Sequence, residues 1–104
     1  GDGGVGWPLV ETEGLLVIEE TLAPGCSEKN HYHNQAEQCF YMLAGCAVMQ
    51  FADGRYVEID TGMALQIPPK TRHAIVNQTG EENRFLVITS PSSRGDRYEV
   101  ERGK

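Results

Sequence analysis

Residues 40–67 read FYMLAGCAVMQFADGRYVEIDTGMALQI, and this stretch determines the fold class of the chain. It holds four short runs rich in Val, Ile, Phe and Tyr, separated by turn residues at Gly45, Asp53-Gly54 and Thr61-Gly62. Such residues favour the pleated, half-buried surface of a sheet, and Asp-Gly between two strand-like runs indicates a hairpin. The stretch therefore predicts strands over residues 40–43, 47–51, 55–59 and 64–67.

The same pattern continues on both sides of this stretch. Strand-like runs occur at residues 15–18, 74–76 and 85–89, and no window holds a sustained 3.6-residue apolar period. Many short strands without helices predict an all-β sandwich or barrel. The small size favours a closed or nearly closed barrel, because closure removes exposed strand edges. We expect one domain over residues 1–104, with a flexible N-terminus at 1–6 and a polar C-terminal tail from about residue 91. This tail is either loose or adds an edge strand at residues 97–100.

Composition and charge exclude several classes of protein. The chain of 104 residues has 15 acidic and 9 basic residues, a formal charge of −6, and no cluster of Lys and Arg, which argues against a nucleic-acid partner. The apolar runs are too short to span a membrane and no signal pattern opens the chain, so we expect a cytoplasmic protein without a membrane partner. The three cysteines form no CxxC pair, which argues against a disulfide framework. Glu20 is interpreted as solvated surface charge.

The three histidines of the chain indicate a metal site. His31 and His33 are separated by one residue, so in an extended backbone both imidazoles point to the same face. His73, from a neighbouring strand, could complete one face of the site. Imidazole suits Zn, Mn, Fe, Ni and Cu ions. The pattern therefore predicts a divalent transition metal ion bound by His31, His33 and His73.

The positions of the glycines and histidines resemble the two motifs of the cupin superfamily. The first motif is a glycine, five residues, a His-x-His pair and a closing glycine: Gly25, His31, His33 and Gly45. The second is a glycine, five residues, and then spaced polar and proline positions: Gly62, Pro68, Lys70, His73 and Asn77. Lys70 occupies a position where cupins usually have Gly. The resemblance implies a small single-domain cupin, an all-β jelly-roll barrel of the double-stranded β-helix type.

The resemblance also implies a fourth ligand, usually Glu, on the strand after the histidine pair. Counting back from Gly45 leads to Gln38, whereas counting forward from the histidine pair leads to Glu37. Neighbouring strand residues face opposite ways, so only one of the two can point at the metal. If Gln38 points inward, Phe40 and Met42 do too, which suits a barrel interior. We favour Gln38 as the fourth ligand, with Glu37 as the alternative.

A ligand set of three imidazoles and one amide has a chemical consequence. It is neutral and leaves the +2 charge of a divalent ion uncompensated, so it favours anionic or polarised oxygen ligands. At these four positions the chain resembles cupins that ketonise uronates. We expect a metal-dependent isomerase or lyase that acts on a small carboxylate, carbonyl or sugar-acid substrate. A metal-dependent dioxygenase, a non-catalytic small-molecule-binding cupin and a vestigial site are the alternatives. No residue is assigned as catalytic, and the resemblance implies a homodimer.

Overall fold

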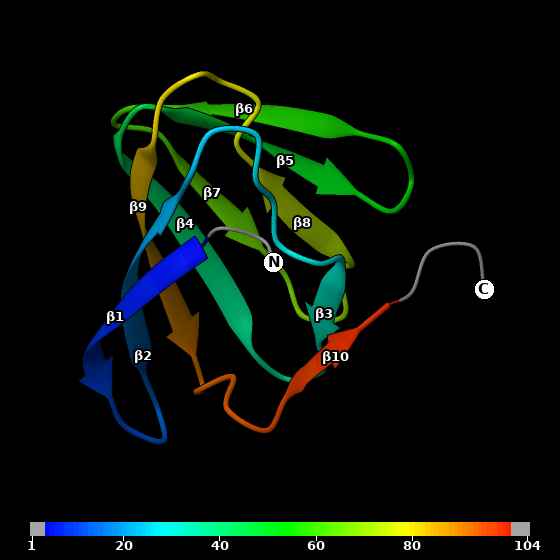
Figure 1. Cartoon of the computed structure of the whole chain (residues 1–104). Coiled ribbons are helices and arrows are strands. Elements are labelled where there is room, and N and C mark those ends of the chain that lie inside the picture. The colour runs from blue at the N-terminus through cyan, green and yellow to red at the C-terminus, as the bar shows by residue number, and fades with distance from the viewer. Residues whose placement is uncertain (1–3, 101–104) are drawn as a thin grey trace.

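The computed structural model describes residues 4–100, and within this range every helix or strand assigned is a β-strand (Figure 1). In chain order the strands are β1 (Gly4–Glu11), β2 (Leu16–Leu22), β3 (His31–His33), β4 (Glu37–Ala44), β5 (Cys46–Phe51), β6 (Tyr56–Asp60), β7 (Ala64–Ile67), β8 (His73–Val76), β9 (Asn83–Ser90) and β10 (Arg97–Glu99). Over the same range there is no helix with the length and hydrophobicity needed to cross a membrane.

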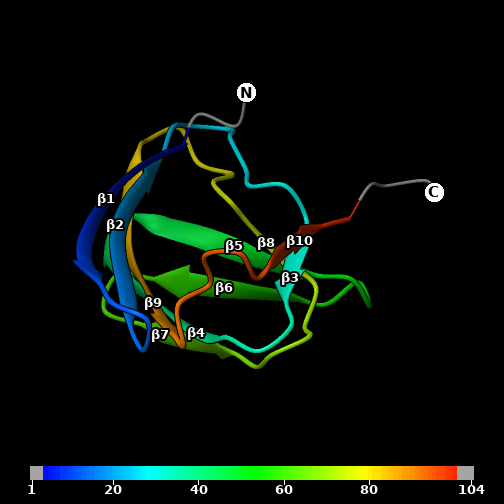
Figure 2. The same cartoon turned by 90° about the horizontal axis from the view of Figure 1, so that it is seen from below.

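The strands form two five-stranded antiparallel sheets that face each other (Figure 2). One sheet has the order β1-β2-β9-β4-β7 and the other the order β10-β3-β8-β5-β6. Strands distant in sequence are therefore neighbours in space, as in a jelly roll. Among the described residues the two sheets are not joined into a closed barrel. The predicted all-β fold class is confirmed, with two facing sheets in place of full closure.

The hydrophobic core fills the space between the sheets, and side-chain alternation along each strand explains its composition. In β4, Gln38, Phe40 and Met42 are buried, whereas Glu37 and Tyr41 are exposed. This is the alternation expected for an inward Gln38. The core consists of buried residues from both sheets: Leu22, Phe40, Met42, Ala47, Met49, Ile59, Ile67, Ile75, Phe85 and Val87.

The four strands predicted for residues 40–67 correspond to β4, β5, β6 and β7. The predicted hairpin at Asp53-Gly54 joins β5 to β6, and Gly54 has a φ of +91°. The strand predicted at residues 15–18 ends too early, because β2 runs on to Leu22. Its polar second half, which lacks a strand-like apolar pattern, is held by pairing with β1 on one side and β9 on the other. Pairing with two neighbours thus extends a strand beyond its local pattern.

The position of Gly45, between β4 and β5, has no room for a side chain. Its φ is +81°, and a Cβ placed there would lie 3.2 Å from the Cβ of Asn83. Both the left-handed backbone and the close approach favour glycine. The buried Asn83 amide fixes this corner, because its Oδ1 accepts the Leu22 N–H at 3.0 Å and its Nδ2 donates to the Cys46 carbonyl at 3.2 Å.

The N-terminal strand β1 lies at one edge of its sheet, with all its residues exposed. Of the flexible N-terminus predicted at 1–6, residues 1–3 lie outside the described residues, and residues 4–6 belong to β1 and pair with the end of β2. Val5, Trp7 and Leu9 present exposed apolar surface on this edge strand. The homodimer implied by the resemblance stays a prediction.

Candidate metal centre

The structure brings the three histidines together on two neighbouring strands. His31 and His33 lie on β3, and His73 begins β8, where it pairs directly with His31. All three side chains are buried, and one potential ligand atom from each lies within 4.8 Å of the others. This group could hold a metal ion.

Hydrogen bonds to the backbone fix the orientation of all three rings. Each Nδ1 lies close to a carbonyl oxygen, that of Lys29 for His31 (2.8 Å), that of Asp96 for His33 (3.1 Å) and that of Thr71 for His73 (2.8 Å). A carbonyl oxygen can only accept, so each Nδ1 donates a proton and each neutral ring keeps its lone pair on Nε2. Such outer contacts are how proteins orient imidazole ligands toward a metal.

The Nε2 atom of His33 is buried and has no hydrogen-bond partner among the described residues. Leaving a buried polar atom without a partner costs about 1–3 kcal/mol. A metal ion at the centre of the three histidines would satisfy this atom. The donor set therefore fits the divalent ion that the motifs predict.

Burial keeps the three rings neutral. It lowers the pKa of His31 to about 3 and that of His73 to about 4, and it also lowers the pKa of His33. The positive charge of Arg97 lowers the pKa of each ring further. At neutral pH the imidazoles thus have the uncharged form that a metal requires.

Gln38 also faces this centre. Its Nε2 donates to Thr89 Oγ1 at 3.2 Å, and its Oε1 lies 3.1 Å from His73 Nε2. Because the His73 proton resides on Nδ1, two lone pairs face each other here. This contact is repulsive unless a cation lies near both atoms.

Glu37, the alternative fourth ligand, points away from the histidines. It is exposed, and its Oε2 accepts a hydrogen bond from Gln66 Nε2 at 3.1 Å on the outer face of the sheet. The structure therefore brings Gln38, and not Glu37, to the three histidines.

A cavity of about 250 Å³ opens beside the histidines. Leu16, Ile18 and Val87 give it an apolar wall, and Glu20, Glu28 and Arg97 give it charged groups. The interpretation of Glu20 as solvated surface charge is therefore wrong, because this half-buried side chain lines the cavity. The sequence could have indicated this position, because residues 16, 18 and 20 are two apart along one strand and so point to the same face.

Arg97 reaches the cavity because β10 pairs with β3, which places Arg97 opposite His33. Of the two alternatives for the polar tail, the edge strand is confirmed, as β10 over Arg97–Glu99. The sequence held no signal that Arg97 lines the cavity, since β10 pairs with a strand more than sixty residues earlier in the chain.

Lys70 has a φ of +65° and is the only residue other than glycine with positive φ among those described. Its N–H donates to the His33 carbonyl oxygen at 2.6 Å, so this strained turn supports the metal centre. The left-handed backbone explains why cupins usually have Gly here, because it costs an L-residue about 1–2 kcal/mol.

We expect Lys70→Gly to raise the free energy of unfolding by about 0.5–1 kcal/mol, the relief of strain less the added entropy of a glycine in the unfolded chain. Urea denaturation measures the change. Lys70→Ala is the matched control, since it removes the same charge and keeps the strain. Equal stability of the two variants would contradict the prediction.

Several solved structures are similar to this chain, whereas none of the curated proteins matches it in sequence. A conserved protein with a double-stranded beta-helix domain from Klebsiella pneumoniae is 18% identical, with a TM-score of 0.85 over 95% of this chain and 85% of its own. The polyketide cyclase RemF from Streptomyces resistomycificus is 25% identical, with a TM-score of 0.84 over 98% of this chain and 74% of its own. A sugar phosphate isomerase of the cupin superfamily from Silicibacter pomeroyi is 21% identical, with a TM-score of 0.81 over 96% of this chain and 67% of its own.

The match to a protein family covers most of the chain. Residues 18–89 match the cupin domain, a range that runs from β2 through β9 and includes all three histidines and Gln38. The two facing sheets and the similar solved structures agree with this match. The chain therefore belongs to the cupin domain family.

Proposed function

We propose that this protein is a metal-dependent enzyme of the isomerase or lyase type, acting on a small carboxylate or carbonyl compound such as a sugar acid. The ion would be held by His31, His33, His73 and Gln38. The observation that carries the proposal is the convergence of three Nε2 lone pairs, each fixed by an Nδ1–H bound to a backbone carbonyl.

A divalent ion in this site would supply Lewis acidity, which polarises a carbonyl group and stabilises negative charge that develops on its oxygen. Because all four ligands are neutral, the site would favour an anionic substrate oxygen. Thr89 holds the Gln38 amide so that its oxygen faces the histidines.

The remaining walls of the cavity have separate tasks. Leu16, Ile18 and Val87 exclude water from one side of a bound substrate. The carboxylates of Glu20 and Glu28 lie on the cavity wall and are the groups that could take a proton from a substrate carbon and return it. Abstraction of a proton from the carbon next to a carbonyl group is the step that such isomerases and lyases have in common.

The similar polyketide cyclase, at 25% identity, supports an enzyme, and the sugar phosphate isomerase is 21% identical. At the identities observed, the isomerase supports the fold alone. The proposed substrate class depends on the neutral ligand set and on the charged groups of the cavity.

Metal analysis followed by a turnover assay tests the proposal. We expect about one divalent ion per chain after reconstitution, and metal-dependent conversion of an unsaturated uronate or a dicarbonyl compound that does not consume O₂. Failure to bind any divalent ion would overturn the proposal. Turnover that consumes O₂ would also overturn it and would favour a dioxygenase.

The fourth ligand is tested by exchanging amide and carboxylate. We expect Gln38→Glu to keep or tighten metal binding, because the added negative charge attracts the ion, and Gln38→Leu to weaken it by roughly 10–100-fold. Glu37→Gln is the matched control and should leave the affinity unchanged, since Glu37 lies on the outer face. Competition with a chromogenic chelator measures the affinity. If Glu37→Gln releases the metal and Gln38→Leu does not, Glu37 is the ligand.

A further inference from the structure

The segment Ser93–Glu99, here called the C-terminal wall, closes one side of the cavity. Ser93, Arg94, Gly95 and Arg97 line the cavity, and the last three residues of the wall form β10 against β3. Figures 1 and 2 both show β10 beside β3 at one end of the two sheets. A segment that reads as a polar tail in the sequence thus forms part of the substrate cavity.

Asp96 anchors this wall. Its carboxylate accepts three backbone N–H groups of the β3–β4 loop, from Asn34 at 3.1 Å, Gln35 at 2.9 Å and Ala36 at 3.1 Å. The carbonyl oxygen of Asp96 accepts the Nδ1–H of His33. One residue therefore holds both the loop after the histidine pair and the orientation of one of those histidines.

A contact between two tyrosines, one on β10 and one on β3, holds the C-terminal wall in addition to Asp96. Tyr98 stacks on Tyr32 with ring centroids 5.3 Å apart, on the opposite face of β3 from the histidines. With Asp96 on one side of Arg97 and Tyr98 on the other, the backbone of Arg97 is fixed beside the metal centre.

The two arginines of the wall differ in their pairing. Arg94 Nη2 lies 2.8 Å from Glu11 Oε2, a short ion pair that holds this side chain. Arg97 Nη2 lies 3.7 Å from Glu99 Oε2, longer than a charge-assisted hydrogen bond. Glu99 is also shared, since its Oε1 lies 3.8 Å from Lys29 Nζ.

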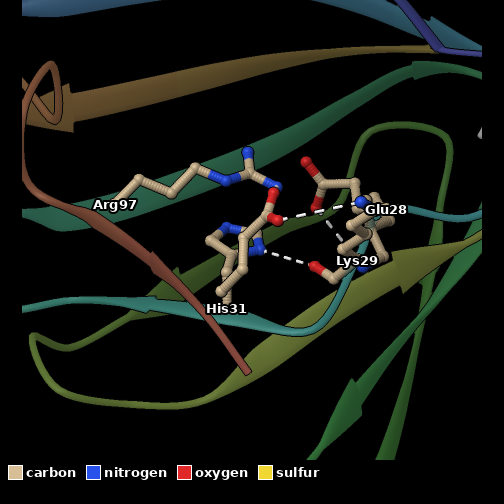
Figure 3. Close-up of polar contacts among 6 residues, drawn as sticks. Glu28, Lys29, His31 and Arg97 are labelled. Atoms are coloured by element: carbon tan, nitrogen blue, oxygen red, sulfur yellow. Dashed lines mark hydrogen bonds and ion pairs between the residues drawn. The ribbon is translucent and has the colours of Figure 1, made fainter. Parts of the chain in front are cut away.

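Figure 3 shows the Arg97 side chain extending from β10 toward the side of the site where Glu28 lies. Its side chain is 42% exposed, so solvent and small molecules can reach it. Arg97 pairs with His33 and lines the same cavity as His31 and His33, which places its side chain beside the metal centre. A planar guanidinium with five N–H donors matches the two oxygens of a carboxylate.

We propose that Arg97 binds the carboxylate of the substrate in this cavity, and that Asp96 positions Arg97 for this contact. The proposal rests on the proposed function for the reaction. It deepens that function by naming the residue that selects an acid over a neutral compound. Glu20 and Glu28 line the same cavity and can accept hydroxyl protons, so the matching ligand is a small hydroxylated acid with its carboxylate at Arg97.

Gluconate and sorbitol provide a matched pair of probes, because they share a hydroxylated six-carbon chain and differ in the carboxylate. Gluconate is titrated into the Zn²⁺-loaded and the metal-free full-length protein, followed by NMR of arginine Nε–H groups and by calorimetry. We expect gluconate to shift the Arg97 resonance in both forms and sorbitol to leave it unchanged. Saturable gluconate binding that leaves the Arg97 resonance in place, or no binding in either form, overturns the proposal.

Variants that remove the positive charge distinguish the contributions of Arg94 and Arg97 to gluconate binding. Arg97→Gln should weaken gluconate binding by about tenfold or more, the effect expected for a lost charge-assisted contact, with unchanged Zn²⁺ content. Arg94→Gln is the matched control in the same wall, and we expect less than about a twofold effect because Glu11 already pairs with Arg94. Equal losses in both variants would show a general charge effect and overturn the assignment. If the unmodified protein fails to bind Zn²⁺ but still binds gluconate through Arg97, the proposed function is overturned and the assignment of Arg97 is not.

The positioning role of Asp96 is tested by a double-mutant cycle. Asp96→Asn replaces the charged acceptor of the loop N–H groups and should weaken gluconate binding while Arg97 is present. In the Arg97→Gln background, Asp96→Asn should have little further effect on the affinity for gluconate, because Asp96 acts through Arg97. A merely structural role would give additive losses, and that result would remove Asp96 from the proposal.

Discussion

His73→Ala is expected to abolish stable metal binding, reducing the content from about one ion per chain to almost none. His73 Nε2 is one of the three converging imidazole nitrogens, and it also faces Gln38 Oε1 at 3.1 Å. Removing it leaves two imidazoles on one strand. Loss of an outer-shell partner alone weakens metal binding about 10–100-fold, and loss of a directly bound imidazole, a stronger ligand than an amide oxygen, should exceed that.

Elemental analysis after reconstitution and gel filtration measures the metal content, and circular dichroism checks that the strands remain. Arg72→Ala is the control, since Arg72 precedes His73 and is exposed. Arg72→Ala should keep the metal. A His73→Ala protein that retains a full equivalent of tightly bound metal would exclude His73 as a ligand and with it the proposed centre.

Asn77→Ala is expected to lower the free energy of unfolding by about 2–4 kcal/mol, because it leaves several buried polar groups without partners. The Asn77 side chain is fully buried. Its Nδ2 donates to the carbonyl oxygens of Leu22 (3.0 Å) and Glu81 (2.8 Å), and its Oδ1 accepts the N–H (3.0 Å) and the hydroxyl (2.7 Å) of Thr79. One amide thus joins the end of β2 to the turn between β8 and β9.

Urea denaturation measures the loss, and Gln78→Ala is the matched control. Gln78 is the next residue along the chain, also carries an amide and is exposed, so its truncation should change stability by less than about 0.5 kcal/mol. Metal content per folded chain should be unchanged in Asn77→Ala, because the residue contacts the turn and not the histidines. If Asn77→Ala were as stable as Gln78→Ala, the four hydrogen bonds would not support the turn.

The sequence by itself determined the features that depend on local periodicity and spacing. Strand alternation was enough to place Gln38, Phe40 and Met42 on one face, and the His-x-His spacing was enough to place His31 and His33 side by side. The turn glycines were readable because only glycine adopts positive φ without strain. Lys70, where cupins usually have Gly, does have a strained backbone with positive φ.

The tertiary structure decided the features that depend on contacts between distant segments. Hydrogen bonds from the histidine Nδ1–H groups to the backbone carbonyls of Lys29, Thr71 and Asp96 direct the Nε2 lone pairs inward. Every residue has a backbone carbonyl, so the residue types do not indicate these contacts. The C-terminal wall is in place because Asp96 satisfies loop N–H groups some sixty residues away. Backbone polar groups pair with whatever partner the fold brings to them, so these pairings follow from three-dimensional packing and not from any local pattern.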